Sequence, residues 1–212
     1  MLPWILLCLV NPATGEDWPA WRADAGRTGY TRESLPSQLE LQWVWKPRHA
    51  PQPAWPRDPR MRFDWAHHVV VADGLVCFGS SAENKISALD AATGELEWTF
   101  LTGGPVRFAP VVWKNQLYAI SDDGLLYCLR LRDGKLINQW RGSEQEDRVL
   151  GNGRITSKWP ARGGPVIYED VLYWGAGIWQ SEGVYLHALD LVNGKVLWTN
   201  DESGAIEMPQ PH

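Results

Sequence analysis

Short apolar runs alternate with turn residues along most of this chain. Residues 69–71, 75–79 and 85–90 are runs of strand length, and Asp73-Gly74 separates the first two. Val, Leu, Ile and aromatic residues are frequent in such runs, and Gly, Asp, Asn and Ser gather between them. This pattern is typical of half-buried strands joined by tight turns. It therefore predicts an all-β protein built from hairpins.

One turn element recurs along the chain. Residues 88–98 read Ala-Leu-Asp-Ala-Ala-Thr-Gly-Glu-Leu-Glu-Trp, and residues 188–198 read Ala-Leu-Asp-Leu-Val-Asn-Gly-Lys-Val-Leu-Trp. The Asp, Thr and Asn residues favour a turn, and the glycine can adopt the positive φ that a hairpin corner needs. A degenerate third copy keeps Gly134, but its aromatic residue, Trp140, comes two places late. Because each copy follows an apolar hairpin, the sequence predicts a repeated four-stranded unit.

The repeat resembles the pyrroloquinoline-quinone (PQQ)-like repeat family of β-propellers, within the quinoprotein alcohol dehydrogenase-like superfamily. Blades of that family carry Ala-x-Asp-x-x-Thr-Gly-x-x-x-Trp, the tryptophan-docking motif, whose Trp packs against the neighbouring blade. The resemblance covers about residues 39–200 and implies a propeller of four-stranded antiparallel blades. The matching positions, of which one departs from the motif by having Asn for Thr, are Ala88, Asp90, Thr93, Gly94, Trp98, Ala188, Asp190, Asn193, Gly194 and Trp198.

Three blades are expected, at about residues 67–100, 108–140 and 164–200. The longer spacing before the third copy comes from two insertions, at about residues 141–159 and 176–183, which we expect on the faces of the disc where binding is common. Three blades do not close a ring, since propellers have about 4–8. Residues 66–212 are therefore interpreted as a truncated propeller, completed by the rest of a longer chain or by self-association.

The first 65 residues precede the blades. Residues 1–15 are predicted to be a signal peptide, because an apolar run is followed by the small residues Ala13 and Gly15. The alternative is a buried N-terminal strand. The run is too short to span a bilayer, and the mature protein is expected to be exported to the periplasm or outside the cell.

Residues 16–65 are expected to form an arm, a closing strand and a loop. The arm is irregular and carries two Trp residues. Residues 39–45 alternate apolar and polar side chains and resemble the last strand of a repeat, so they are predicted to pair with the final blade and close the ring. The proline-rich residues 46–65 are expected to be a surface loop.

Charge and cysteine content exclude some functions. The net charge is −5 and the Lys and Arg residues are scattered, which argues against a nucleic-acid partner. Cys77 and Cys128 lie inside apolar runs and are expected to be buried core residues. No CxxC or other metal-type spacing is present, so no metal site is predicted.

Candidate ligand-binding residues precede the innermost strands, which face the central channel of a propeller. Aligning the repeats places Arg107 and Arg162 at equivalent positions, and His67 and His68 lie next to the equivalent place in the first blade. A positive channel mouth of this kind suits a carboxylate or phosphate. In the alternative interpretation these arginines bond carbonyls and carboxylates between blades.

Two tryptophans in the insertions are further candidates. Trp159 and Trp179 would stack on a sugar or a quinone, or else cover the face of the disc. No catalytic residue is assigned, because no nucleotide-binding, nucleophile-elbow or zinc-hydrolase motif is present.

The resemblance implies two possible functions. Dehydrogenases of the family hold PQQ over the channel with calcium, and often have adjacent cysteines, which this sequence lacks. Non-catalytic members, similar to the periplasmic propeller that assists outer-membrane protein assembly, use no cofactor. We expect an exported scaffold that binds a protein, peptide or glycan through inter-blade loops. The alternative is a fragment of a PQQ-dependent quinoprotein dehydrogenase, in which Arg107 or Arg162 would help hold the anionic quinone.

Overall fold

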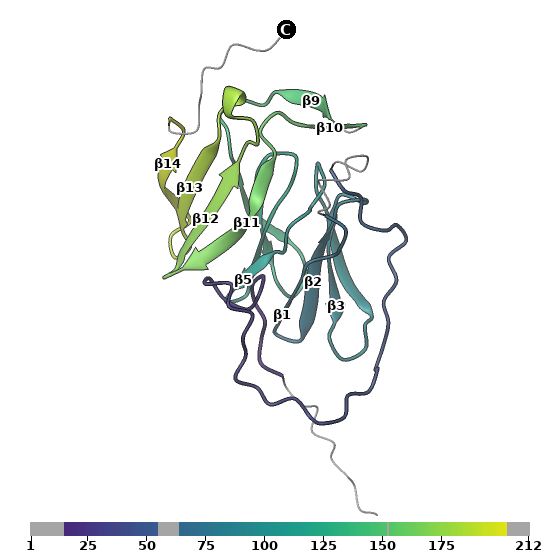
Figure 1. Ribbon diagram of the computed structural model, residues 1–212. Helices are drawn as coiled ribbons and strands as arrows, with labels where there is room; N and C mark the ends of the chain where they lie inside the picture. Colours follow the sequence, from purple (N-terminus) through teal and green to yellow (C-terminus); the bar gives the residue numbers. More distant parts are fainter. Residues whose placement is uncertain (1–14, 55–63, 152, 203–212) are drawn as a thin grey trace, which may run out of the picture.

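The computed structural model describes residues 15–54, 64–151 and 153–202 of the 212-residue chain. Three antiparallel sheets of four strands dominate this part of the chain (Figure 1). In each sheet the strands follow one another in chain order, so each sheet is a meander. The fold is an incomplete β-propeller, as the repeats predict. No helix of the described residues is long and apolar enough to cross a membrane.

The three blades and the elements between them have the following bounds. Blade 1 contains β1 (Val69–Ala72), β2 (Leu75–Ser80), β3 (Lys85–Asp90) and β4 (Leu96–Leu101). Blade 2 contains β5 (Val111–Trp113), β6 (Gln116–Ile120), β7 (Leu125–Arg130) and β8 (Leu136–Arg141). Blade 3 contains β11 (Ala161–Tyr168), β12 (Val171–Ala176), β13 (Tyr185–Asp190) and β14 (Lys195–Asn200). The insertions hold a hairpin, β9 (Arg148–Gly151) and β10 (Arg154–Ser157), and a 3₁₀ turn, η1 (Gln180–Glu182).

The hydrophobic core lies between the blades. Ile86 and Ala88 of blade 1 pack with Leu117 and Leu129 of blade 2, and a second cluster joins blades 2 and 3. The cysteines belong to these clusters and are free thiols, Cys77 in the first and Cys128 in the second. Burial raises the pKa of the Cys77 thiol to about 12 and that of Cys128 to about 11, which keeps both thiols protonated and unreactive at neutral pH.

A tryptophan from one blade packs on the turn of the next. The Trp98 side chain is 8% exposed, and its indole Nε1 donates to the carbonyl of Leu131 at 2.8 Å. Its ring covers the turn glycine Gly134 so closely that a Cβ there would lie 2.5 Å from ring atom Cε3. Trp98 thus joins blade 1 to blade 2.

Trp43 makes the same contact with blade 1. Its Nε1 donates to the carbonyl of Ala91 at 3.0 Å, and a Cβ on Gly94 would lie 2.6 Å from ring atom Cδ2. Residues 39–45 pair with none of the described residues and form no strand. Their predicted pairing with the final blade of a closed ring stays a prediction, because a strand needs a hydrogen-bonded neighbour and the described residues include three blades that do not close. Trp43 thus packs on the turn of blade 1 although its segment has no strand hydrogen bonds.

The third blade and the first insertion differ from the prediction. β11 begins at Ala161 rather than near residue 164, and its register shifts between Arg162 and Val166 because Gly163 and Gly164 have positive φ. Such a bulge adds residues to one strand of a pair without ending it. The insertion at residues 141–159 was expected to be loop, and contains the β9–β10 hairpin.

The N-terminal arm touches the first strand of every blade. Trp18 and Val71 of β1 exchange two backbone hydrogen bonds, of 2.7 and 2.9 Å. The amide of Val112 in β5 donates to the Pro19 carbonyl at 2.8 Å, and Arg27 Nη2 donates to the carbonyl of Gly163 in β11 at 3.3 Å. The arm therefore runs across the inner edges of the blades (Figure 1).

The turn glycines offer a matched test of the inter-blade tryptophan contact. Gly134 and Gly194 have nearly the same φ, 66° and 72°, but a Cβ on Gly194 would meet nothing within 4 Å. Alanine at either position is expected to lose about 1–2 kcal/mol to left-handed backbone strain. Gly134→Ala should lose a further ~1–3 kcal/mol because it displaces Trp98. Urea unfolding of the two variants measures the difference, and equal losses would contradict the contact.

Candidate functional site

Arg107 and Arg162 meet on one carboxylate, that of Asp122. Arg107 Nε donates to Asp122 Oδ2 at 2.7 Å, while Arg162 donates through Nε to Oδ1 and through Nη2 to Oδ2, both at 2.9 Å. Arg107 precedes β5, Asp122 follows β6, and Arg162 lies in β11, so the cluster joins blades 2 and 3. The side chains of Asp122 and Arg107 are 2% and 5% exposed. The ion pair is therefore sheltered from water.

The remaining donors of Arg107 turn toward the proline-rich segment. Nη1 donates to the Gln52 carbonyl at 2.7 Å and lies 3.3 Å from Oδ2 of Asp64. A cavity of about 40 Å³ remains among these groups, which is room for a few water molecules at about 10–15 Å³ each. These contacts agree with the interpretation in which the arginines join the blades. Ligand binding by Arg107 and Arg162 stays a prediction.

The side chains of the two predicted histidines, His67 and His68, have different surroundings. His67 Nδ1 lies 3.0 Å from the carbonyl oxygen of Gly79, and its ring packs against Trp45 and Phe78. The ring of His68 lies instead edge-on to Trp21, with centroids 6.4 Å apart. Consecutive residues of an extended chain point to opposite sides, so the pair does not form a single positive site with the arginines.

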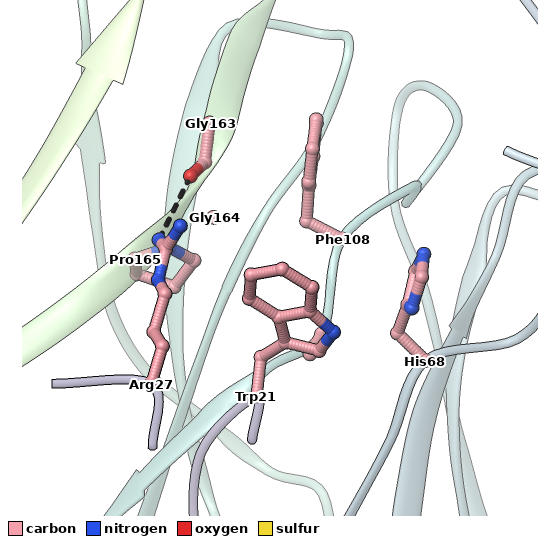
Figure 2. A pocket seen from close by; sticks show the side chains of 8 residues that line it. Trp21, Arg27, His68, Phe108, Gly163, Gly164 and Pro165 are labelled. Carbon is pink, nitrogen blue, oxygen red and sulfur yellow. Dashed lines mark hydrogen bonds between the residues drawn. The ribbon is translucent and has the colours of Figure 1, made fainter. Parts of the chain in front are cut away.

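A pocket beneath the N-terminal arm, here called the arm pocket, takes in His68. Figure 2 shows the Trp21 ring between Arg27 and His68. The guanidinium carbon of Arg27 lies 5.0 Å from the centroid of the Trp21 ring, a cation–π contact. The pocket has a volume of about 180 Å³. It is lined by Trp21, Arg27, His68, Phe108, Ala109, Gly163, Gly164 and Pro165.

The arm pocket could not be predicted from the sequence, because its walls come from segments that are far apart along the chain. Trp21 and Arg27 belong to the arm, Phe108 precedes β5, and Gly163 lies in β11. Two tryptophans and an arginine in an otherwise irregular segment were the available signal. The surface is mainly apolar, with one guanidinium and one imidazole at its sides, which suits a small ring-shaped group.

The two tryptophans of the insertions have different surroundings. Trp159 is buried, and its Nε1 donates to the carbonyl of Glu182. Its ring packs edge-on to Tyr185, so it belongs to the core between blades and offers no open face for stacking. Trp179 precedes η1 and is exposed. Of the two, Trp179 alone keeps a face free for a partner.

The β9–β10 hairpin lies above the blades, at the top of the view in Figure 1. Leu150 and Ile155 face each other across the hairpin and are 79% and 66% exposed. Arg154 anchors the hairpin to blade 1, where Nη1 donates to the Ser81 carbonyl at 2.8 Å and to Asn84 Oδ1 at 3.1 Å. Burial, followed by repulsion from Arg107, lowers the pKa of Arg154, and Asp122 opposes this.

The hairpin was not predicted, although its sequence carries a signal for it. Residues 148–157 place an Asn-Gly dipeptide between two short runs that contain apolar residues, and Asn-Gly is a frequent hairpin turn. Its position over blade 1 depends on Arg154, whose partners are about 70 residues away along the chain.

Comparison with known proteins gives one family and a fold. A family model described as outer membrane protein assembly factor BamB matches residues 7–205. No curated protein matches the chain in sequence.

Solved structures with the same fold include bacterial dehydrogenases. The quinohemoprotein alcohol dehydrogenase from Comamonas testosteroni is 21% identical, with a TM-score of 0.63 over 87% of this chain and 27% of its own. A europium-containing methanol dehydrogenase is 14% identical, with a TM-score of 0.62 over 87% of this chain and 32% of its own. The quinohemoprotein alcohol dehydrogenase ADHIIG from Pseudomonas putida HK5 is 20% identical, with a TM-score of 0.52 over 63% and 20%. This chain thus spans between a fifth and a third of these proteins, and the likeness shows the propeller fold.

Proposed function

Because the chain belongs to the family of PQQ-like repeat β-propellers whose model is described as outer membrane protein assembly factor BamB, we propose that it is an exported, non-catalytic module that binds a protein partner. The observation that carries the proposal is the β9–β10 hairpin, which holds two exposed apolar side chains in a fixed place. The family description, an assembly factor, supports a protein as the partner.

The anchoring of the hairpin supports its role as a contact surface. An isolated two-stranded hairpin is only marginally stable in water, yet Arg154 ties this one to blade 1 and to the Gln52 side chain. A hydrogen bond to a charged group contributes about 1.5–3 kcal/mol. Presenting Leu150 and Ile155 from an ordered hairpin lowers the entropy lost on binding. Clustered exposed apolar side chains mark contact sites on many proteins.

The contacts of the described residues give no support to the rival function, a PQQ-dependent dehydrogenase. The guanidinium groups of Arg107 and Arg162 are directed at Asp122, and the cavity beside them is far smaller than a tricyclic quinone. Within residues 15–54, 64–151 and 153–202, no group of three or more His, Cys, Asp or Glu side chains is placed to hold a metal ion. Cys77 and Cys128 lie in strands of different blades. We therefore derive no step through PQQ.

Site-directed photo-crosslinking in the complete protein tests the proposal. A photo-reactive amino acid at Leu150 or Ile155 should capture a protein partner in the cells that make it. The same group at Val192, an exposed position in the β13–β14 turn, should not. Arg154→Ala should reduce capture at Leu150 by about tenfold, which corresponds to 1.4 kcal/mol, because the hairpin is no longer fixed to blade 1.

Two results would overturn the proposal. One is equal capture from Leu150 and Val192, which would mean that the hairpin is no contact surface. The other is saturable quenching of tryptophan fluorescence by PQQ and calcium together with dye-linked alcohol oxidation, which would establish the dehydrogenase function.

A further inference from the structure

The contact between blades 2 and 3 lacks the tryptophan that closes the other contacts. In blade 2, Asn138 stands opposite Cys128, as Trp98 stands opposite Ala88 in blade 1. Asn138 is exposed, and its side-chain oxygen Oδ1 accepts a hydrogen bond from the backbone amide of Gln139. The turn glycine of blade 3, Gly194, has open space where the equivalent glycines have an indole ring.

A cleft of about 380 Å³ lies along this same contact, here called the seam cleft. One wall comes from the end of β8 and the loop after it, and the other from β12, β13 and β14. Its residues are Trp140, Arg141, Gly142, Ser143, Glu144, Trp174, Tyr185, His187, Val196, Thr199 and Asp201.

Ring stacking and hydrogen bonds hold the side chains of the inner part of the seam cleft. The rings of Trp174 and His187 stack with centroids 4.5 Å apart and an interplanar angle of 26°. His187 Nε2 lies 3.0 Å from the Gly142 carbonyl of blade 2, and Nδ1 lies 3.0 Å from Oγ1 of Thr199. Burial lowers the pKa of His187, so the ring is neutral at pH 7. Nε2–H then donates to Gly142, and Nδ1 accepts from the Thr199 hydroxyl.

The charges at the rim of the seam cleft disfavour an anionic ligand. Arg141 forms an ion pair with Glu146, Nη2 to Oε1 at 2.8 Å. Glu144 and Asp201 add two carboxylates, which repel an anionic ligand. A neutral ligand with many hydrogen-bonding groups can meet the charged and polar groups of the rim without bringing a charge of its own.

We propose that the seam cleft is a binding site for a neutral saccharide. A pyranose ring has an apolar C–H face and hydroxyl groups around its edge. The rings of Trp140 and Tyr185, both partly exposed, would receive the apolar face. The Arg141 and Glu144 side chains at the rim, and the buried hydroxyl of Ser143, supply the donors and acceptors that the hydroxyl groups of a sugar need. The site lies between the second and third blades, the pair of blades that lacks a docking tryptophan at the turn.

Isothermal titration of the complete protein with cellobiose, maltotriose, N,N′-diacetylchitobiose and choline tests this site. At least one saccharide should bind with a Kd of about 1 mM or tighter. Choline should not bind. Trp140→Ala should weaken saccharide binding at least tenfold, and Trp179→Ala, at an exposed tryptophan outside the cleft, should leave it unchanged. Glu144→Ala, a substitution at an exposed loop residue that leaves the fold intact, should also weaken it.

The proposal is overturned if none of the three saccharides binds, if choline binds in their place, or if Trp140→Ala and Glu144→Ala bind as the unsubstituted protein does. Crosslinking from Leu150 is independent of these titrations, so failure of one proposal leaves the other standing.

Discussion

Replacing Asp122 by Asn should lower the free energy of unfolding by about 3–5 kcal/mol, the usual loss when one partner of a buried ion pair is removed. Asp122 is the shared counter-ion of Arg107 and Arg162, and its side chain is 2% exposed. Asn keeps the volume of the side chain but not its charge. Arg107 would then remain buried with Asp64 3.3 Å from its Nη1, and Arg162 would lose its two-point contact with a charged carboxylate.

A matched control is available in the turn of blade 2. Asp133 lies 3.3 Å from Arg130 Nη1 and 3.7 Å from Lys135 Nζ, but its side chain is 26% exposed. Exposed pairs of this kind contribute about 0–1 kcal/mol, so Asp133→Asn should lose no more than that. Urea unfolding of both variants, followed by tryptophan fluorescence, gives the comparison. Equal losses would mean that the Asp122 cluster does not hold the blades together.

Replacing Trp98 by Ala should also lose about 3–5 kcal/mol of unfolding free energy, the range for removing a buried large aromatic side chain. The substitution empties the space over the Gly134 turn and leaves the Leu131 carbonyl without its indole donor. The cluster shared by blades 1 and 2 would then lose its largest side chain.

Trp179→Ala serves as the control for the loss of Trp98. Trp179 is exposed, and substitutions at exposed sites usually change stability by about 0.5 kcal/mol or less. The measurement is the same urea titration, with the unfolding slope compared to check that both variants unfold in one step. A loss below about 1 kcal/mol for Trp98→Ala would show that the tryptophan does not carry the contact between these blades.

The strands and turns of the blades could be predicted because their chemistry is local. Asp90 Oδ1 accepts hydrogen bonds from the Ala92 amide at 3.0 Å and the Thr93 amide at 2.7 Å. Asp190 does the same for the Val192 and Asn193 amides. All partners lie within three residues, so the turn is encoded where it forms. β3 accordingly has the predicted bounds, Lys85–Asp90.

The site could be predicted only in part. The repeat alignment placed Arg107 and Arg162 at equivalent positions, and the structure brings them together. Their counter-ion was not foreseen, because Asp122 lies in Ser-Asp-Asp-Gly, a sequence that indicates no more than a turn. The arm pocket and the seam cleft depend on which distant segments meet, and local patterns carry no such information.

The N-terminal arm has a consequence for the order of folding. Each blade is a meander whose strand pairs join neighbouring segments, and each blade packs on the next one along the chain. The arm instead needs β1, β5 and β11 in place, and the bond between Arg27 and Gly163 spans 136 residues. Closing long loops is entropically unfavourable, and non-local contacts form slowly. The arm, which precedes all three blades in synthesis, is therefore the last of the described segments to reach its native position.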